Sequence, residues 1–202
     1  MSDGAPRIAA LLLAAGLSRR MGGTNKLLAT VSGRPLVRIA AEAALASRAH
    51  ELVVVTGHEA AAVEAALAGL AYRAAHNPDF VEGMATSLRA GIGSLGSDID
   101  GTVVLLADMP AVTAATIDAV IAALAPGVIV VPTFGGVRGN PVGWWRDYFV
   151  ELAAQSGDRG GRDVISRHPE DVREIALDRG VALDVDTPEA LAEIGAAGSR
   201  NT

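Results

Sequence analysis

The chain has 202 residues, half of them hydrophobic and only 3% aromatic, and its formal net charge is −6. This length predicts one domain, and 39 alanines indicate a core of small aliphatic side chains. The acidic balance excludes a general nucleic-acid groove, because affinity for phosphate backbones comes from clustered Lys and Arg. Without cysteine there is no disulfide, no cysteine zinc site and no thiol chemistry, so a cytoplasmic location is expected.

An apolar run from Ile8 to Ala15 follows Asp3 and Arg7 and leads into a glycine-rich loop. Eight residues are too few to span a bilayer, and a secretory signal would have a longer apolar region and a small-residue cleavage site. We therefore predict a buried strand here, and neither a membrane segment nor a targeting sequence.

Short β-branched runs alternate with alanine-rich segments of helical length through most of the chain. The predicted strands are Ile8–Leu13, Leu52–Thr56, Tyr72–His76, Thr102–Leu106 and Val128–Pro132. The predicted helices are Pro35–Ser47, Ala60–Leu67, Met84–Ile92 and Thr113–Leu124, with Pro35 in a first turn and Thr113 as a cap. This alternation predicts an α/β fold with a mostly parallel sheet covered on both faces.

After Pro132 the elements become shorter and the loops longer. The sequence predicts a turn at Thr133–Gly139, a strand at Pro141–Trp144, a helix at Asp147–Ala154 and a glycine-rich loop at Gly157–Arg162. A short helix to His168, a strand at Val172–Leu177, a last helix from Pro188 and a frayed tail at 195–202 follow. We expect this half to form an appended layer over the sheet.

The first predicted strand runs directly into a loop that carries three glycines, Gly16, Gly22 and Gly23, and ends at Lys26. Glycines let the backbone N–H groups point inward, as in loops that cradle phosphates, and Arg19, Arg20 and Lys26 supply countercharge. The pattern is neither G-x-G-x-x-G nor a Walker A loop, since a Gly-Lys pair occurs nowhere. The loop is therefore a candidate anion site of another kind.

Lys26 is the only lysine in the chain, beside 16 arginines. Its compact ammonium on a flexible stem suits a polyphosphate better than a planar guanidinium does. The alternative is a solvated lysine on an ordinary turn between a strand and a helix.

Two acidic residues are candidate metal ligands. Asp108 directly follows the strand Thr102–Leu106, and open α/β sheets bind ligands outside the carboxyl ends of their strands. Mg²⁺ prefers one or two carboxylates together with phosphate oxygens. Asp186 precedes Thr187 and Pro188, which by themselves explain the start of a helix. The alternatives are a cap before Pro110 for Asp108 and a helix cap for Asp186.

The other polar residues give weaker indications. The four histidines (50, 58, 76 and 168) lack metal-ligand spacing, so solvated loop positions are expected. Trp144 and Trp145 are predicted to pack in the core or an interface rather than stack on a ligand. The Gly157–Arg162 loop fits either a mobile surface turn or a second anion loop with two guanidinium groups.

Several motifs occur in a characteristic order along the chain. They are LAAG with Ser18, Arg20, Met21, Gly22 and Lys26; Asn77-Pro78; EGM with Ser87-Leu88-Arg89-Ala90-Gly91; LADMP at 106–110; Gly139-Asn140-Pro141; GD-x-GGR at 157–162; and Asp186-Thr187-Pro188. Over about residues 7–194 the chain thereby resembles the MobA/MocA-like molybdenum cofactor nucleotidyltransferases. The resemblance implies a three-layer α/β/α fold with a Rossmann-like sheet of the nucleotide-diphospho-sugar transferase type.

The same resemblance implies roles for individual residues. Lys26 and Arg20 would hold the triphosphate and act in catalysis together with Asp108, and Asp108 and Asp186 would carry Mg²⁺. The other implied nucleotide-binding residues are Leu13, Ala14, Ala15, Gly16, Gly83 and Ser87, and the implied acceptor-binding residues are Asn140, Asp158 and Arg162. Within one domain of residues 1–202, residues 7–132 would form the nucleotide-binding half and residues 133–194 the acceptor-binding half.

Within the family, the cytidylyltransferase branch is the closer match. The guanylyltransferase branch resembles Leu-Ala-Gly-Gly at the first motif, whereas this chain has Ala15 before Gly16, and the extra methyl group disfavours the larger purine. The resemblance thus implies Mg²⁺-dependent transfer of CMP from CTP to the phosphate of a molybdopterin-type cofactor, with release of pyrophosphate. A molybdoenzyme or its chaperone is a further candidate partner, whereas nucleic acid and membrane are not expected.

Two alternatives remain open at this point. One is a nucleotidyltransferase with a sugar or polyol phosphate as acceptor, or with GTP as donor. The other is a different use of the fold, as a nicotinamide- or flavin-linked reductase or as an assembly chaperone for a molybdoenzyme. The missing G-x-G-x-x-G and the pair Asp108 and Asp186 argue against the reductase.

Overall fold

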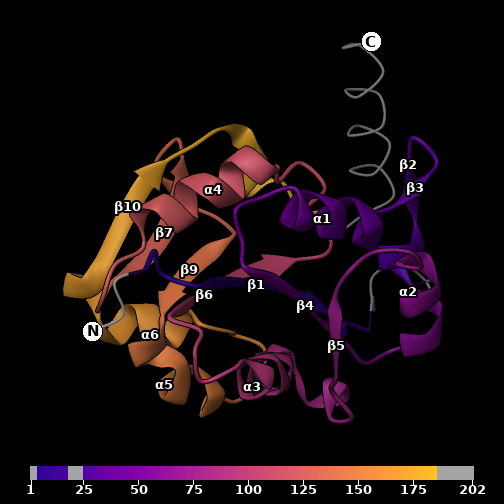
Figure 1. Cartoon of the computed structure of the whole chain (residues 1–202), viewed down its shortest axis with the longest axis horizontal. Helices are drawn as coiled ribbons and strands as arrows, with labels where there is room; N and C mark the ends of the chain where they lie inside the picture. Colours follow the sequence, from indigo (N-terminus) through magenta and orange to yellow (C-terminus); the bar gives the residue numbers. More distant parts are fainter. Residues whose placement is uncertain (1–3, 18–24, 186–202) are drawn as a thin grey trace.

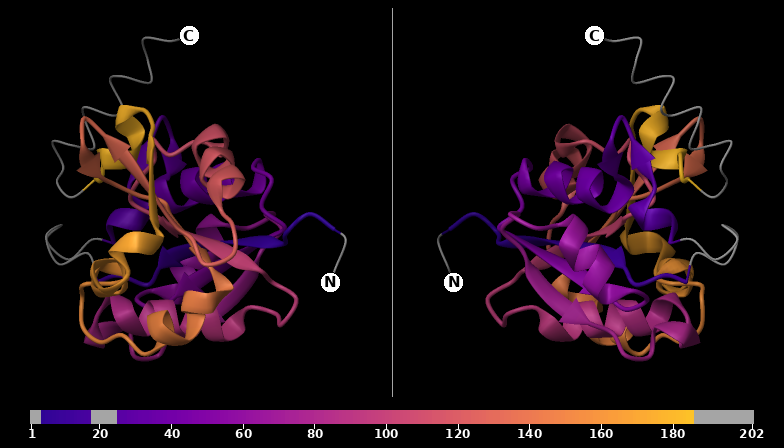
Figure 2. Two further views of the ribbon diagram at one scale, coloured as in Figure 1. Left: turned by 90° about the vertical axis from the view of Figure 1, so that its left-hand side faces the viewer. Right: turned by 90° about the vertical axis from the view of Figure 1, so that its right-hand side faces the viewer.

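A mixed sheet of eight strands lies between two layers of helices (Figure 1). The computed structural model describes residues 4–17 and 25–185. The predicted site residues Arg20 and Asp186 and the predicted helix from Pro188 lie outside the described residues. The side views show helices again on both sides of the sheet (Figure 2), so the predicted three-layer α/β/α class is confirmed.

The strand order is β10-β7-β9-β6-β1-β4-β5, with β8 paired to β7. The strands are β1 (Ile8–Ala14), β4 (Glu51–Thr56), β5 (Arg73–His76), β6 (Gly101–Leu106), β7 (Ile129–Phe134), β8 (Val137–Arg138), β9 (Val142–Trp145) and β10 (Val172–Ala176). Strands β4, β5 and β6 run parallel to β1 or its neighbours, and β9 runs antiparallel between β6 and β7. The sheet is therefore mostly parallel, as predicted. Strands β8, β9 and β10 pair within this sheet, so the strands of the second half do not form the appended layer that the sequence led us to expect.

Within residues 4–17 and 25–185, three helices cover each face of the sheet. Helices α1 (Leu36–Leu45), α2 (Ala60–Ala66) and α4 (Ala114–Ala123) pack on one face. Helices α3 (Met84–Ser94), α5 (Phe149–Ala153) and α6 (Arg162–Arg167) pack on the other (Figure 1). Short 3-10 helices complete the chain: η2 (Lys26–Leu28), η3 (Phe80–Glu82), η4 (Arg146–Tyr148), η5 (Pro169–Asp171) and η6 (Arg179–Ala182).

Strand β1 is buried along its whole length, as its apolar run predicts. Ile8, Ala10 and Leu12 face the helices α1 and α4, whereas Leu11 and Leu13 face α3 and α5, because successive strand side chains point to opposite faces. Parallel partners on both sides, β4 and β6, satisfy its backbone. A strand without a polar face therefore sits at the centre of the molecule.

The two helix starts predicted from the sequence differ in outcome. Thr113 is the N-cap of α4 as predicted, and it forms a capping box in which its side chain accepts from the Thr116 backbone and Thr116 accepts in return. Pro35 does not lie in the first turn of α1. Its backbone is extended (ψ 144°) and it pairs with Thr30 in a two-stranded hairpin of β2 (Thr30–Val31) and β3 (Arg34–Pro35), so the helix begins at Leu36.

The predicted turn at Thr133–Gly139 is wrong in its extent. Strand β7 continues through Phe134, and β8 pairs back onto it in antiparallel register. Only Gly135 and Gly136 form the turn, with φ values of 58° and 79° that favour glycine in a tight two-residue hairpin. The segment is therefore a hairpin at the edge of the sheet.

In the described part of the chain, no helix has both the length and the apolar character that a membrane crossing requires. The apolar run at Ile8–Ala15 forms the buried strand β1, as predicted.

Gly91 and Gly93 offer a matched test of how closely α3 packs on the sheet. A Cβ at Gly91 would lie 2.5–2.7 Å from the Leu11 side chain, whereas nothing lies within 4 Å of a Cβ at Gly93. Gly93→Ala should stabilise the protein by up to about 1 kcal/mol through helix propensity. Gly91→Ala gains the same propensity but should be about 1–3 kcal/mol less stable than Gly93→Ala because of overpacking. Urea unfolding measures both, and equal stabilities would contradict this packing.

Candidate functional site

The carboxyl ends of β1, β4 and β5 come together tightly at one edge of the sheet. The carbonyl of Ala15, just after β1, accepts a hydrogen bond of 3.3 Å from the His58 N–H. A Cβ at Gly57 would lie 2.8 Å from both Ala15 and Phe80, so only glycine fits between them. The loop after β1 thus borders the segment that leads into α3. Ligands of open α/β sheets bind at this kind of edge.

Lys26 and Asp108 form an ion pair at this edge, although 82 positions separate them in the sequence. The Lys26 Nζ atom lies 2.5 Å from Asp108 Oδ2, and the two side chains are only 16% and 18% exposed. The Asn25 side chain accepts from the Leu27 N–H and so begins the 3-10 helix η2 that carries Lys26. The structure therefore brings together the two residues that the sequence singled out separately as a phosphate-binding cation and a metal-binding acid.

Asp108 is held by its backbone as well as by its side chain. The preceding N–H, of Ala107, donates to Leu13 of β1, and the Asp108 carbonyl accepts from Val185 at 2.9 Å. Within the described residues, the second carboxylate oxygen, Oδ1, is buried and has no hydrogen-bond partner. Buried carboxylate oxygens normally have one. A hard oxygen ligand without a partner fits a divalent cation such as Mg²⁺.

The start of α3 rests on the second glycine-rich loop. The Met84 N–H donates to Asp158 Oδ1 at 3.3 Å and the Ala85 N–H donates to the Gly157 carbonyl at 3.0 Å. Gly83 has φ 111°, and a Cβ there would lie 2.4 Å from Asp158 Oδ1. The loop after Gly157 is thereby attached to the nucleotide-binding half predicted from the sequence.

A pocket of about 140 Å³ opens between this loop, α3 and the sheet. All three predicted acceptor-binding residues line it: Asn140, Asp158 and Arg162. Its floor is apolar and includes Trp144 and Leu106, the last residue of β6. Trp144 is 2% exposed and packs in the core, as expected. An apolar floor with a few polar groups at the rim is typical of small-molecule sites.

The remaining predicted nucleotide-binding residues lie along the same edge. Leu13 and Ala14 are buried residues of β1, Ala15 is buried just beyond it, and Gly16 is exposed. Ser87 lies in the first turns of α3 and is 7% exposed. These candidates therefore lie at the end of β1 and at the start of α3.

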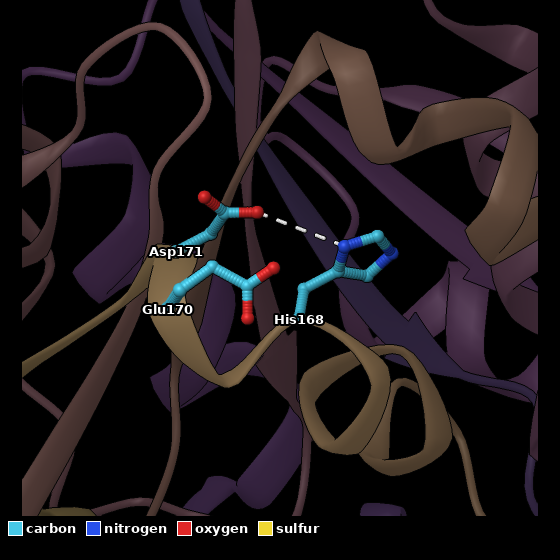
Figure 3. Close-up of side chains that lie close together, drawn as sticks. All are labelled: His168, Glu170 and Asp171. Atoms are coloured by element: carbon cyan, nitrogen blue, oxygen red, sulfur yellow. Dashed lines mark ion pairs between the residues drawn. The ribbon is translucent and has the colours of Figure 1, made fainter.

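Sequence reasoning missed a second polar cluster, around His168 (Figure 3). The His168 Nε2 atom lies 2.7 Å from Glu151 and Nδ1 lies 3.6 Å from Asp171, and Glu170 stands beside them. The expectation of solvated histidines is therefore wrong for His168, which is half-buried. Glu151 is seventeen positions away, so no local spacing could have revealed the pair.

The Tyr148 ring packs edge-on against His168, with ring centroids 5.3 Å apart. Burial and the neighbouring carboxylate of Asp171 raise the pKa of Tyr148 well above its ordinary value. Both ring nitrogens of His168 face carboxylates, so the cluster ties α5 to η5 through ion pairs.

A mostly parallel sheet between two layers of helices is the fold of the α/β nucleotidyltransferases. Residues 10–172 match the MobA-like NTP transferase domain, and the chain belongs to this family.

Two characterised bacterial proteins are similar to the chain over almost its whole length. The nicotine blue oxidoreductase of Paenarthrobacter nicotinovorans is 32% identical over 92% of this chain and 95% of its own. The purine catabolism protein PucB of Bacillus subtilis is 31% identical over 91% of this chain and 94% of its own. The two relatives have different names, although each is similar to this chain over nearly its full length.

Solved structures show the same fold. The Mycobacterium sp. strain JC1 homologue of Rv0371c superposes with a TM-score of 0.87 at 27% identity, covering 97% of this chain and 98% of that one. The Mycobacterium tuberculosis Rv0371c protein, in a complex with manganese, has a TM-score of 0.81 at 29% identity, covering 95% and 99%. The fold expected from the sequence is thereby confirmed.

Gly83 and Gly69 give a matched test of the contact between α3 and the Gly157 loop. Both have positive φ, 111° and 83°, but a Cβ at Gly69 meets nothing within 4 Å. Alanine at either site should cost about 1–3 kcal/mol in backbone strain. Gly83→Ala should cost more, because its Cβ also meets Asp158 and the Gly157 backbone. Equal losses in urea unfolding would argue that the loop does not rest on Gly83.

Proposed function

We propose that the protein transfers CMP from CTP to the phosphate of a molybdopterin-type cofactor and releases pyrophosphate, with Mg²⁺ as its metal, in the cytoplasm. Membership of the MobA-like family supports nucleotidyl transfer in general. The observation that carries the site assignment is the Lys26–Asp108 ion pair beside the buried Oδ1 atom of Asp108. It combines a phosphate-binding cation with a metal-binding carboxylate at the strand ends.

In this proposal Lys26 and Arg20 bind the triphosphate and stabilise the departing pyrophosphate. Asp108 and Asp186 would hold the metal, which when bound supplies positive charge to the phosphates. Val185, the residue before Asp186 in the sequence, donates a backbone hydrogen bond to the Asp108 carbonyl. The manganese complex of the M. tuberculosis relative supports a divalent ion in this fold.

The reaction needs no strong general base, because the acceptor phosphate is already an anion. Its oxygen forms a bond to the α-phosphorus while the bond from that phosphorus to pyrophosphate breaks. Catalysis then consists of in-line positioning and charge stabilisation by Lys26 and Arg20. Lys26 would exchange its partner Asp108 for the phosphates when the nucleotide binds. The ion pair keeps both groups in place until then.

Residues 7–132 would bind the nucleotide and residues 133–194 the acceptor. The nucleoside would lie along Leu13, Ala14, Ala15 and Gly16 on one side and Gly83 and Ser87 on the other. The acceptor would occupy the pocket lined by Asn140, Asp158 and Arg162, whose apolar floor suits a flat ring system and whose guanidinium suits a phosphate. The family resemblance at Ala15, where the guanylyltransferase branch has glycine, supports the smaller base.

One observation favours a second candidate, an oxidoreductase: a relative that is 32% identical over nearly its full length is named nicotine blue oxidoreductase. A protein of that class would respond to a reduced nicotinamide nucleotide rather than to CTP. The two candidates therefore separate in a ligand panel.

Thermal shifts with CTP, GTP and NADPH, each with and without Mg²⁺, test the donor. At about 100 times its Kd, Mg·CTP should raise Tm by roughly 5–10 °C, because binding to the native state stabilises by mass action. GTP should raise Tm less, and removal of Mg²⁺ should reduce the CTP effect. A larger response to GTP contradicts the choice of base, and a response to NADPH alone supports the oxidoreductase.

Substitution of Lys26 tests the phosphate role. Lys26→Ala should lower kcat/KM for CMP transfer roughly 10²–10³-fold, the scale for one preorganised charge-stabilising group. Lys26→Arg should recover only part, since a planar fork cannot replace a point charge. Arg34→Ala is the matched control, because Arg34 is an exposed cation paired with Glu42 on the surface, and it should leave kcat/KM unchanged. Near-normal activity of Lys26→Ala would refute the site.

Asp108→Asn should abolish the Mg²⁺-dependent turnover while leaving the fold intact, because an amide is a poor ligand for Mg²⁺ and the backbone contacts of this residue remain. Asp118→Asn, at an acid that pairs with Arg48 on the surface, is the control and should retain activity. Circular dichroism checks the fold of both variants. Full turnover by Asp108→Asn would remove the metal role from this carboxylate.

A further inference from the structure

Asn77 is a buried polar residue that the proposed mechanism does not use. It directly follows β5, is 2% exposed, and its backbone N–H donates to the carbonyl of Thr56 at the end of β4. Its side chain makes three hydrogen bonds, all to residues between β5 and the first turns of α3. It therefore stands where two strands end and the helix that carries Ser87 begins.

The direction of each of these hydrogen bonds follows from one backbone group. The Asp79 N–H can only donate, so the Asn77 atom 3.0 Å away must be the amide oxygen Oδ1. The other end of the amide is then Nδ2, which can only donate. It lies 2.9 Å from Thr86 Oγ1 and 3.0 Å from Ser87 Oγ, and both hydroxyl oxygens must accept.

The two hydroxyl groups differ in where their own hydrogen goes. Thr86 Oγ1 lies within 3.0 Å of the backbone carbonyls of Asp79 and Gly83, so its hydrogen has an acceptor inside the protein. For Ser87, the only hydrogen bond of the side chain among the described residues is the one it accepts from Asn77. Its hydrogen is directed away from Asn77 and needs an acceptor that the described protein does not supply.

We infer that Asn77 is a positioning residue that holds the Ser87 hydroxyl as a hydrogen-bond donor, and that the site thereby selects a base with an acceptor at this point. The inference rests on the proposed function, in which Ser87 lines the nucleoside. Cytosine has two acceptors on its pairing edge, N3 and the carbonyl at position 2, and we assign the carbonyl to this hydrogen bond. A base that presented an N–H group there would face a second donor and bind more weakly, because a donor left without an acceptor is costly.

Asn77→Asp reverses the polarity with almost no change in shape. One carboxylate oxygen takes the place of Nδ2 and accepts the Ser87 hydrogen, so the serine turns a lone pair toward the base. A second variant, Ser87→Ala, removes the hydroxyl group. Inorganic tripolyphosphate serves as a ligand without a base, so the ratio of the Mg·CTP and Mg·tripolyphosphate affinities corrects for any change in charge.

Isothermal titration of the full chain with both ligands measures this ratio. Each of Asn77→Asp and Ser87→Ala should lower it about tenfold, the scale of one hydrogen bond lost to a ligand. In the double variant, Asn77→Asp should add nothing to the effect of Ser87→Ala, because it acts through that hydroxyl. Thr86→Val, which removes the other acceptor of the same amide, is the control and should leave the ratio unchanged. An equal effect of Asn77→Asp with and without Ser87 would overturn the inference.

A second measurement changes the ligand instead of Asn77. The triphosphate of 2-thiocytidine replaces the one carbonyl with a weak acceptor, so the wild-type protein should bind it several-fold less tightly than CTP, whereas Ser87→Ala should bind both alike. Equal binding of the two by the wild type overturns the inference while leaving CTP as the nucleotide. If the wild type binds Mg·CTP no more tightly than Mg·tripolyphosphate, the proposed function itself fails, and the inference fails with it.

Discussion

The complete burial of β1 is the constraint on which the rest of the structure depends. A strand with apolar side chains on both faces is stable only when helices cover both sides and parallel strands flank it. Parallel strands place their carboxyl ends at one edge, so the loops after β1, β4, β5 and β6 are forced together. The ion pair of Lys26 and Asp108 lies where these loops meet.

Asp108 joins the two halves of the chain at this edge. Its side chain reaches Lys26 from the first loop, its carbonyl receives Val185, and its neighbour Ala107 continues the pairing of β6 with β1. Two opposite charges that are mostly shielded from water attract each other far more strongly than an exposed pair does. The ion pair therefore holds both side chains in place where the strands end.

Glycines set the distances between the remaining parts of the site. Gly57 lets the loop after β4 lie against Ala15 and Phe80, and Gly83 lets α3 begin directly against the Gly157 loop. The pocket lined by Asn140, Asp158 and Arg162 exists because these close approaches hold the second glycine-rich loop over the sheet. Close backbone approach, together with the hydrogen bonds from Met84 and Ala85, thus holds the Gly157–Arg162 loop against the start of α3.

The amino-acid sequence by itself was sufficient to predict the fold class, the central strands and the helices between them, because short apolar runs and the spacing of apolar residues in helices are local features of the sequence. Thr113 as a cap belongs to the same group, since a capping box spans only four residues. The extent of β7 was not predictable in this way, because Phe134 joins the strand only through pairing with β8 across two glycines.

The sequence also marked Lys26 and Asp108 as candidates by residue type and position, and the family resemblance added Asn140, Asp158 and Arg162. Only the tertiary structure decided that Lys26 and Asp108 touch, that Asn140, Asp158 and Arg162 share one pocket, and that His168 pairs with Glu151. It alone also gave the direction of the hydrogen bond between Asn77 and Ser87. These facts depend on residues far apart in the chain or on the orientation of one amide, and neither leaves a periodic trace in the sequence.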